Sequence, residues 1–304
     1  MTRLKSKARR DRLLRRVRAQ RVKYIAVLPS LITILNGVFG FIAIVFASRV
    51  TDTEQGVAGL SYFAMAGYMI LLAMFADMLD GRLARMSQST SGFGGQLDSL
   101  CDLISFGVAP AFIMLKVIEV RSGSATPLSG NLFHRFVWLA ALAYISCAVI
   151  RLARFNVENE ESEAAHMKFV GLPSPGAAGA IVSLVIFHQE VIQKLMPKLD
   201  ALIYGLPFVT LGLAILMVSR IPYPHVLNLY LRGKQPFSYL MRVLLFLGLV
   251  WWNMQTAIVL IFGVFAGSGL VRWFYAKIKH EGTRILSADA DLATHGSGES
   301  EIPG

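Results

Sequence analysis

The sequence has little charge, few cysteines and no grouped histidines. Only 16% of its 304 residues are Asp, Glu, Lys or Arg, whereas a typical soluble domain has about 25%. Two cysteines imply no disulfide framework, and the six histidines lack the spacing of metal ligands or of a Ser-His-Asp triad. The Gly/Ser/Pro-rich stretch 122–130 lacks the Lys-Ser/Thr ending of a phosphate-binding loop. These absences exclude a soluble globular domain, a disulfide-rich secreted domain and a P-loop site.

Long apolar runs take the place of charge. The chain is 55% hydrophobic, with a mean hydropathy of +0.55, and a helix needs about 20 mostly apolar residues to cross a bilayer. The candidate spans are 27–48, 60–81, 94–118, 135–155, 174–193, 200–219, 237–252 and 255–276. The sequence therefore predicts an all-α polytopic membrane helix bundle, with a six-helix core and two extra C-terminal spans.

Positive charge is concentrated at the N-terminus. The net charge is +11, and residues 1–23 alone hold eleven Lys or Arg and one Asp. Because basic segments stay in the cytoplasm, this arm predicts a cytosolic N-terminus, and eight spans bring the C-terminus to the same side. The arm also suits an anionic lipid surface, whereas its direct continuation into a span argues against nucleic-acid binding. The apolar run after it is too long for a secretory signal.

Four aspartates interrupt the second and third apolar runs. Asp77 and Asp80 are spaced i,i+3 near the end of the second run, and Asp98 and Asp102 are spaced i,i+4 near the start of the third. Each spacing places both carboxylates on one helical face, and the short connection makes the two helices antiparallel neighbours. A charged residue at the centre of a membrane helix costs at least ~2.5 kcal/mol. We therefore expect the four carboxylates to converge and to be neutralised by divalent metal.

Mg²⁺ or Mn²⁺ fits such a set because hard cations prefer oxygen ligands. Two neighbouring ions would suit phosphoryl transfer, because they stabilise both the attacking and the leaving oxygen. Gly81, Ala84 and Gly94 leave room for a ligand to approach the helices, and Arg85 can bind a phosphate through two hydrogen bonds. The alternative, in which the aspartates only pair with nearby arginines, leaves their regular spacing unexplained.

The run from Asp77 to Asp102 reads D-x-x-D-G-x-x-A-R-x8-G-x-x-x-D-x-x-x-D. At every position this pattern resembles the signature of the CDP-alcohol phosphatidyltransferases. The resemblance implies a six-helix core, often dimeric, with a metal pair at the cytosolic membrane boundary. It also implies that Asp77, Asp80 and Asp98 are metal ligands, and that Asp102 touches the second metal and acts as the general base.

The same resemblance extends to the substrates. It implies a CDP site lined by Gly81, Ala84, Arg85 and Gly94 and approached by two residues of the first span, Thr33 and Asn36. The segments 105–110, 151–156 and 169–175 resemble those of the membrane-integral phosphatidylserine synthases of bacteria and archaea. The implied reaction transfers the phosphatidyl group from CDP-diacylglycerol to L-serine, releases CMP and takes place in a homodimer.

The residues themselves leave the acceptor alcohol open. Arg151 and Arg154, spaced i,i+3 at the cytosolic end of a span, can bind the carboxylate of serine, but they can equally contact the donor phosphate or anchor the span. Ser105 is a further candidate for the acceptor site. Segment 169–175 either forms part of that site or simply begins the fifth helix, with prolines in its first turn. Glycerol 3-phosphate, an inositol phosphate and choline are the alternative acceptors.

A cation channel or transporter is the alternative from another class of protein. Its carboxylates would lie near the bilayer midplane on broken helices, whereas these gather at the cytosolic end beside an arginine and several glycines. A non-catalytic scaffold would leave the aspartates unexplained. We therefore expect an enzyme of the cytoplasmic (inner) membrane, with its active site and both termini on the cytosolic side.

The chain divides into four predicted regions. We expect a basic arm over 1–25, a catalytic transmembrane core over 26–225, a transmembrane hairpin over 226–282 and a disordered tail over 283–304, where small and polar residues dominate. In the last span, Gly263 and Gly267 predict a helix-packing face, either within the chain or between two chains.

Overall fold

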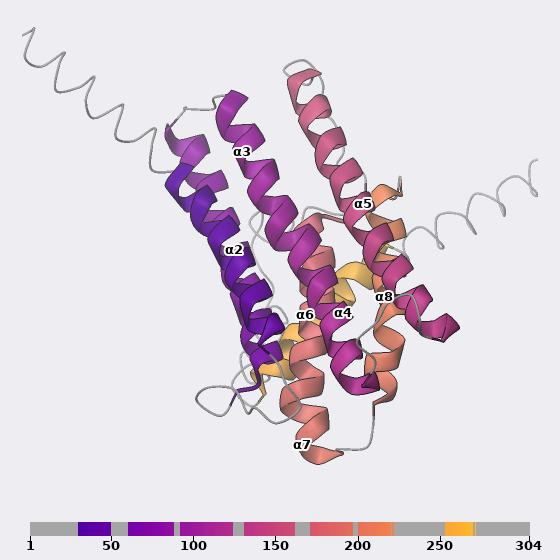
Figure 1. The fold of residues 1–304 in the computed structure, drawn as a ribbon. Helices are drawn as coiled ribbons and strands as arrows, with labels where there is room; N and C mark the ends of the chain where they lie inside the picture. The colour runs from indigo at the N-terminus through magenta and orange to yellow at the C-terminus, as the bar shows by residue number, and fades with distance from the viewer. Residues whose placement is uncertain are drawn as a thin grey trace, which may run out of the picture.

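The computed structural model describes residues 30–49, 60–87, 92–123, 131–161, 171–196, 200–219, 221, 253–269 and 271. Side chains are described within these ranges except at 84–87, 92 and 158–161. Every regular element in the described ranges is a helix (Figure 1). The predicted arm, the predicted tail and the predicted span 237–252 lie outside the described residues.

Within the described ranges, six helices are long and apolar enough to cross a membrane. They cover Ser30–Ser48, Tyr62–Leu83, Phe93–Ser122, Leu132–Val157, Ser174–Leu195 and Ala201–Val218. Each lies within a few residues of one of the first six predicted spans, so the prediction of a six-helix membrane core is confirmed. A shorter apolar helix follows at Met254–Gly269, in the region where the eighth span was predicted.

The second to sixth spans are built from the helices labelled in Figure 1 and two π-helical segments. The second is α2 (Tyr62–Ser87), the fourth is α5 (Leu132–Glu161) and the sixth is α8 (Ala201–Val218). The third span is continuous through α3 (Gly92–Asp102), the π-helix η2 (Leu103–Val108) and α4 (Ala109–Ser122). The fifth is continuous through α6 (Ser174–Phe187), the π-helix η4 (His188–Ile192) and α7 (Gln193–Leu195).

Small residues allow the helices to pack closely. α5 packs along α8 and α2 packs along α6, while α4 contacts α2, α5, α6 and α8. Alanines recur among the fully buried residues of these helices, including Ala66, Ala73, Ala140, Ala141, Ala177 and Ala178. Alanine lets helix backbones approach closely, which drives association in lipid, where apolar burial gives no advantage. Larger side chains such as Ile113 and Tyr144 fill the space that remains.

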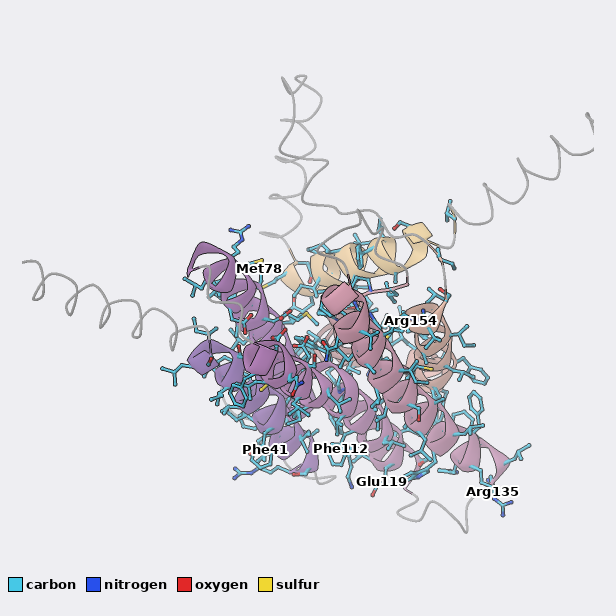
Figure 2. All side chains as sticks on the ribbon, turned by 90° about the horizontal axis from the view of Figure 1, so that it is seen from above. Phe41, Met78, Phe112, Glu119, Arg135 and Arg154 are labelled. Carbon is cyan, nitrogen blue, oxygen red and sulfur yellow. The ribbon has the colours of Figure 1, made fainter. Side chains whose placement is uncertain are left out.

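The outer surface of the bundle is apolar. Phe41 and Met78, which lie on the outside in the view along the bundle (Figure 2), are 61% and 43% exposed. Phe75, Leu139 and Phe208 are also more than half exposed. So much exposed apolar surface is rare in soluble monomers, and it fits helices whose side chains face lipid. Helices can lie in lipid because they satisfy their own backbone hydrogen bonds.

Candidate active site

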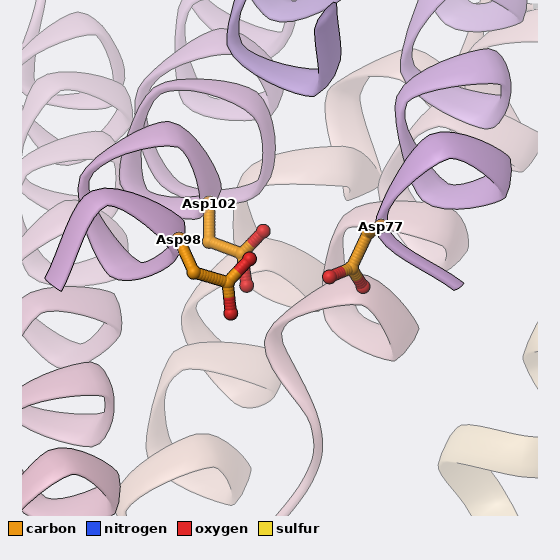
Figure 3. Close-up of side chains that lie close together, drawn as sticks. All are labelled: Asp77, Asp98 and Asp102. Carbon is orange, nitrogen blue, oxygen red and sulfur yellow. The ribbon is translucent and has the colours of Figure 1, made fainter. Parts of the chain in front are cut away.

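Three of the four motif aspartates meet between α2 and α3. Oxygen atoms of Asp77, Asp98 and Asp102 lie within 4.8 Å of one another. Figure 3 shows Asp98 and Asp102 side by side, with Asp77 facing them across the site. Asp102 is buried, whereas Asp77 and Asp98 are half-buried. For these three residues the predicted convergence is confirmed.

Asp80 lies beside this cluster and faces the first helix. It is buried, and its carboxylate has hydrogen-bond partners in the Thr33 side chain and the Gly81 backbone. The physical reason is its position on α2: three residues after Asp77 it is rotated by about 60° and lies one turn further along. All four carboxylates were expected to converge. In the structure Asp80 lies outside the group of three and bonds to Thr33 on the first helix.

The first helix also reaches the cluster through Asn36. The Asn36 side-chain amide donates a hydrogen bond of 2.8 Å to Asp102 Oδ1, and the Ser105 hydroxyl donates one of 2.8 Å to the Asn36 carbonyl. All three residues are buried. Asn36 was predicted near the nucleotide and Ser105 near the acceptor, but in the structure both polar groups bond within the protein.

A glycine makes this contact possible. A Cβ atom on Gly40 would lie 2.7 Å from Ser105 Cα, closer than real side chains approach. Only glycine therefore lets the first helix approach η2 closely enough for Asn36 and Asp102 to bond.

Ser105 belongs to the π-helix η2, in which the Ala109 N–H donates to Ile104 O, five residues back. The Tyr144 hydroxyl of α5 donates a hydrogen bond of 2.9 Å to the Phe106 carbonyl in the same segment. Single π-helical turns within α-helices frequently occur at functional sites. Here the π-helix directly follows Asp102 and supplies the residue that bonds to the Asn36 backbone.

Among the described residues, Arg151 of α5 is an arginine whose charge interacts with the aspartates. Its guanidinium donates a hydrogen bond of 2.7 Å to the Ser174 hydroxyl, and it interacts electrostatically with Asp77 and Asp102. Arg154 is half-buried on the same helix and forms no hydrogen bond or ion pair with the described residues. The structure thus brings Arg151, but not Arg154, to the aspartate cluster.

The predicted CDP-binding residues lie at the ends of α2 and α3 that face the cluster. A Cβ atom added to Gly81 would meet nothing within 4 Å, so the space beside this residue is open. Gly94 is half-buried near the start of α3. Ala84 and Arg85 lie in the last turns of α2, and their side chains are outside the described part of the chain.

Three residues near the site were not singled out individually from the sequence. The Ser99 hydroxyl donates a hydrogen bond of 2.9 Å to Asn156 Oδ1, which joins α3 to α5 beside Asp98. Ser174, the partner of Arg151, lies in the segment 169–175 but carried no individual signal. Asn156 likewise ends the segment 151–156, so both segments could have directed attention to them.

The donor set suits a hard divalent cation. Its atoms are carboxylate oxygens, which Mg²⁺ and Mn²⁺ prefer. Asp80 Oδ2 and Asp98 Oδ1 are buried and have no hydrogen-bond partner in the described part of the chain. Buried carboxylate oxygens without partners are costly, so a cation bound there would satisfy them. The residues present therefore fit a metal site.

The helical bundle and its aspartates define a polytopic membrane protein with a carboxylate site toward one end. Residues 26–218 match the family model of the CDP-alcohol phosphatidyltransferases. The chain belongs to this family.

Curated relatives agree with the assignment. The chain is 31% identical over 252 residues to the CDP-diacylglycerol–serine O-phosphatidyltransferase of Helicobacter pylori (strain J99), a match that covers 83% of this chain and 92% of the relative. It is 31% identical over 229 residues to the protein of the same name from Methanocaldococcus jannaschii, covering 75% and 86% of the two chains. The Saccharomyces cerevisiae protein of that name is 37% identical over 158 residues, about half of each chain (50% and 51%).

Proposed function

We propose that this protein transfers the phosphatidyl group from CDP-diacylglycerol to L-serine, forming phosphatidylserine and CMP. Family membership and the names of its relatives support the reaction. The observation that carries the proposal is the meeting of Asp77, Asp98 and Asp102 beside Arg151. This arrangement offers carboxylates for metal and a base, and a cation for an anionic substrate group.

A pair of Mg²⁺ or Mn²⁺ ions is the proposed cofactor. Asp77, Asp80 and Asp98 would hold one ion, and Asp102 would contact the second. Bound there, the ions would offset negative charge on the pyrophosphate and on the leaving CMP. The unpartnered oxygens of Asp80 and Asp98 support this assignment.

Asp102 is the proposed general base. Its Oδ1 accepts the hydrogen bond from Asn36, which leaves Oδ2 to take the proton of the serine hydroxyl. The serine oxygen then attacks the β-phosphorus of CDP-diacylglycerol, the new P–O bond forms, and the bond to CMP breaks. General-base help of this kind contributes roughly 10²–10⁴-fold to a rate. No covalent intermediate with the enzyme is required.

Arginines would bind the charged groups of the two substrates. Arg151 is the better placed for the serine carboxylate, because its guanidinium interacts electrostatically with Asp77 and Asp102 and is held by a hydrogen bond to Ser174. Arg85, with Gly81, Ala84, Gly94 and Thr33, would bind the CDP moiety. A free carboxylate distinguishes serine from choline, for which a neighbouring arginine would be unfavourable.

The proposal includes location and assembly. The basic arm supports an inner-membrane protein with its active site and both termini in the cytosol, the arm lying on anionic lipid. Family resemblance supports a homodimer, and the remaining C-terminal residues are proposed to complete a two-span hairpin. Crosslinking of the purified protein in bilayers, and protease access to each terminus in sealed vesicles, test these points.

The decisive experiment supplies CDP-diacylglycerol with serine, glycerol 3-phosphate, an inositol phosphate or choline in separate reactions and measures CMP release. Activity with serine alone is expected, and a clear preference for another acceptor would refute the serine assignment. EDTA should stop the reaction, and added Mg²⁺ or Mn²⁺ should restore it.

Asp98→Asn tests the site itself. This variant should lose CMP release by about a hundredfold or more, because losing a group that merely orients a metal ligand already costs about 10–100-fold in metal affinity or activity. Glu119→Gln is the matched control, because it makes the same chemical change in a partly exposed i,i+3 pair with Lys116 on α4, where an ion pair contributes little. Full activity in the Asp98 variant would remove the metal site from the proposal.

A further inference from the structure

The segment before α6 is hydrogen-bonded to the end of α8 and the residues just after it. The Gly171 N–H donates to the Ile221 carbonyl at 2.9 Å, and the Leu172 N–H donates to the Leu216 carbonyl at 3.1 Å. Gly171 has φ of 93°, and a Cβ atom there would lie 2.5 Å from the Met217 carbonyl. Both the backbone conformation and the close approach require glycine, so the residues that follow have a fixed position.

This fixed position continues into the first turn of α6. Pro173 precedes the helix, and Pro175 lies in its first turn, where a missing N–H is tolerated. Between them Ser174 is fully buried, and its hydroxyl accepts the 2.7 Å hydrogen bond from Arg151. The start of α6 therefore determines where the Arg151 guanidinium lies relative to Asp77 and Asp102.

The helix Met254–Gly269 packs against the same first turns of α6. A Cβ atom on Gly176 would lie 2.6 Å from the Phe265 ring, and one on Gly179 would overlap the Phe262 ring. These glycines are spaced i,i+3, as are the two phenylalanines, so the rings occupy two successive notches on α6. The helix lies behind α6 and α8 in Figure 1, where it is drawn in yellow.

The other end of this helix is also tied to the bundle. Asn253 Oδ1 accepts a hydrogen bond from the Thr256 N–H and caps the helix, and Gln255 bonds to the Tyr68 side chain of α2. A Cβ atom added to Gly263 or to Gly267 would meet nothing within 4 Å among the described residues. Among the described residues it is the phenylalanine face that contacts α6, so the packing face at Gly263 and Gly267 stays a prediction.

The helix lies beyond the residues 26–218 that match the family. We propose that it is a positioning element for the acceptor side of the site: Phe262 and Phe265 hold the start of α6, α6 holds Ser174, and Ser174 holds Arg151 for the acceptor carboxylate. The last step rests on the proposed function, whereas the three contacts before it are independent of the acceptor.

The first test is the double variant Phe262→Ala/Phe265→Ala in the full-length protein. We expect the KM for serine to rise about tenfold, equivalent to ~1.4 kcal/mol, with little change in the KM for CDP-diacylglycerol. Val264→Ala, at a 67% exposed position between the two phenylalanines, should leave both constants unchanged. A general loss of structure would instead lower the thermal midpoint and impair both substrates equally, and that result would overturn the proposal.

The second test asks whether the effect passes through Ser174. If it does, Ser174→Ala alone should raise the KM for serine by a similar factor, and adding the phenylalanine changes to it should have little further effect. Contacts that act through one another give such non-additive results, whereas independent sites give additive ones. Additive effects would overturn the proposal. If the double variant does not fold, Phe265→Leu replaces it, because leucine keeps an apolar side chain against Gly176.

The two proposals can fail separately. If the unaltered protein uses a different acceptor, the serine assignment fails, and the same variants are then measured with the acceptor that is used. If serine is the acceptor but its KM is insensitive to Phe262, Phe265 and Ser174, the positioning role fails and the reaction stands.

Discussion

Replacing Asn36 by leucine removes the N–H group that holds Asp102 while nearly conserving the side-chain volume. The lost hydrogen bond is 2.8 Å long and lies between fully buried Asn36 and buried Asp102. A hydrogen bond to a charged group contributes about 1.5–3 kcal/mol. If that bond positions Asp102 for proton transfer, kcat should fall by about 10- to 100-fold, since every 1.4 kcal/mol is a factor of ten.

The stability of the same variant should fall by less than the full 1.5–3 kcal/mol of the lost bond. Asn36 Oδ1 is buried without a hydrogen-bond partner in the described part of the chain, and leucine removes this unfavourable group together with the favourable one. The Ser105 hydroxyl bonds to the Asn36 backbone, which the substitution does not alter. We therefore expect activity and thermal stability to separate.

The assay measures CMP release over a range of Mn²⁺ and serine concentrations, with the thermal midpoint and Mn²⁺ binding determined on the same preparations. Thr210→Val is the control, because it removes from α8 another buried polar atom that has no hydrogen-bond partner among the described residues, without touching the cluster. A leucine variant with kcat within about twofold of the unaltered protein would refute the positioning role of Asn36, since the lost bond would then contribute under ~0.4 kcal/mol.

Three further predictions concern the packing around the site. Gly40→Ala should lower stability by about 1–3 kcal/mol through overpacking against Ser105, whereas Gly212→Ala, which meets nothing within 4 Å, should not; equal thermal midpoints would contradict the close approach. Gly171→Ala should cost at least about 1–2 kcal/mol, because φ of 93° disfavours any side chain. Gly205→Ala, in the second turn of α8, is its control in the same thermal assay. Asn156→Ala should lower the free energy of unfolding by about 1 kcal/mol, because it removes the hydrogen bond between Ser99 and α5. An unchanged free energy in chemical unfolding in detergent would contradict a stabilising role for this bond.

The sequence predicted the first six spans well because a bilayer imposes one simple requirement. Backbone groups in lipid must be satisfied within the helix, so apolar length alone locates a span. The meeting of Asp77, Asp98 and Asp102 could also be predicted, because residues spaced i,i+3 or i,i+4 lie on one face of a helix. Asp80 shows the limit of this reasoning, because its partner Thr33 comes from a helix whose packing no local pattern specifies.

Contacts between distant residues could not be predicted in the same way. Asn36 and Asp102 are 66 positions apart, and their hydrogen bond depends on how closely Gly40 lets two helices approach. Phe262 and Phe265 carried no signal of their own in the sequence, whereas the spacing of Gly263 and Gly267 attracted attention to another face of the same helix. The notches at Gly176 and Gly179 are visible only once α6 and the last helix are seen together.

The π-helix Leu103–Val108 has a consequence for how this chain can vary in length. Its hydrogen bond from Ala109 to Ile104 closes over one residue more than an α-helical bond would. Loss of one residue here can be absorbed by a return to α-helical bonding, so Asp98 and the core residues of α4 would keep their faces. The same loss inside α3 or α4 would rotate one half of the span against the other by about 100°. Length variation in relatives of this chain is therefore expected to fall in this segment, at the expense of the Ser105 contact.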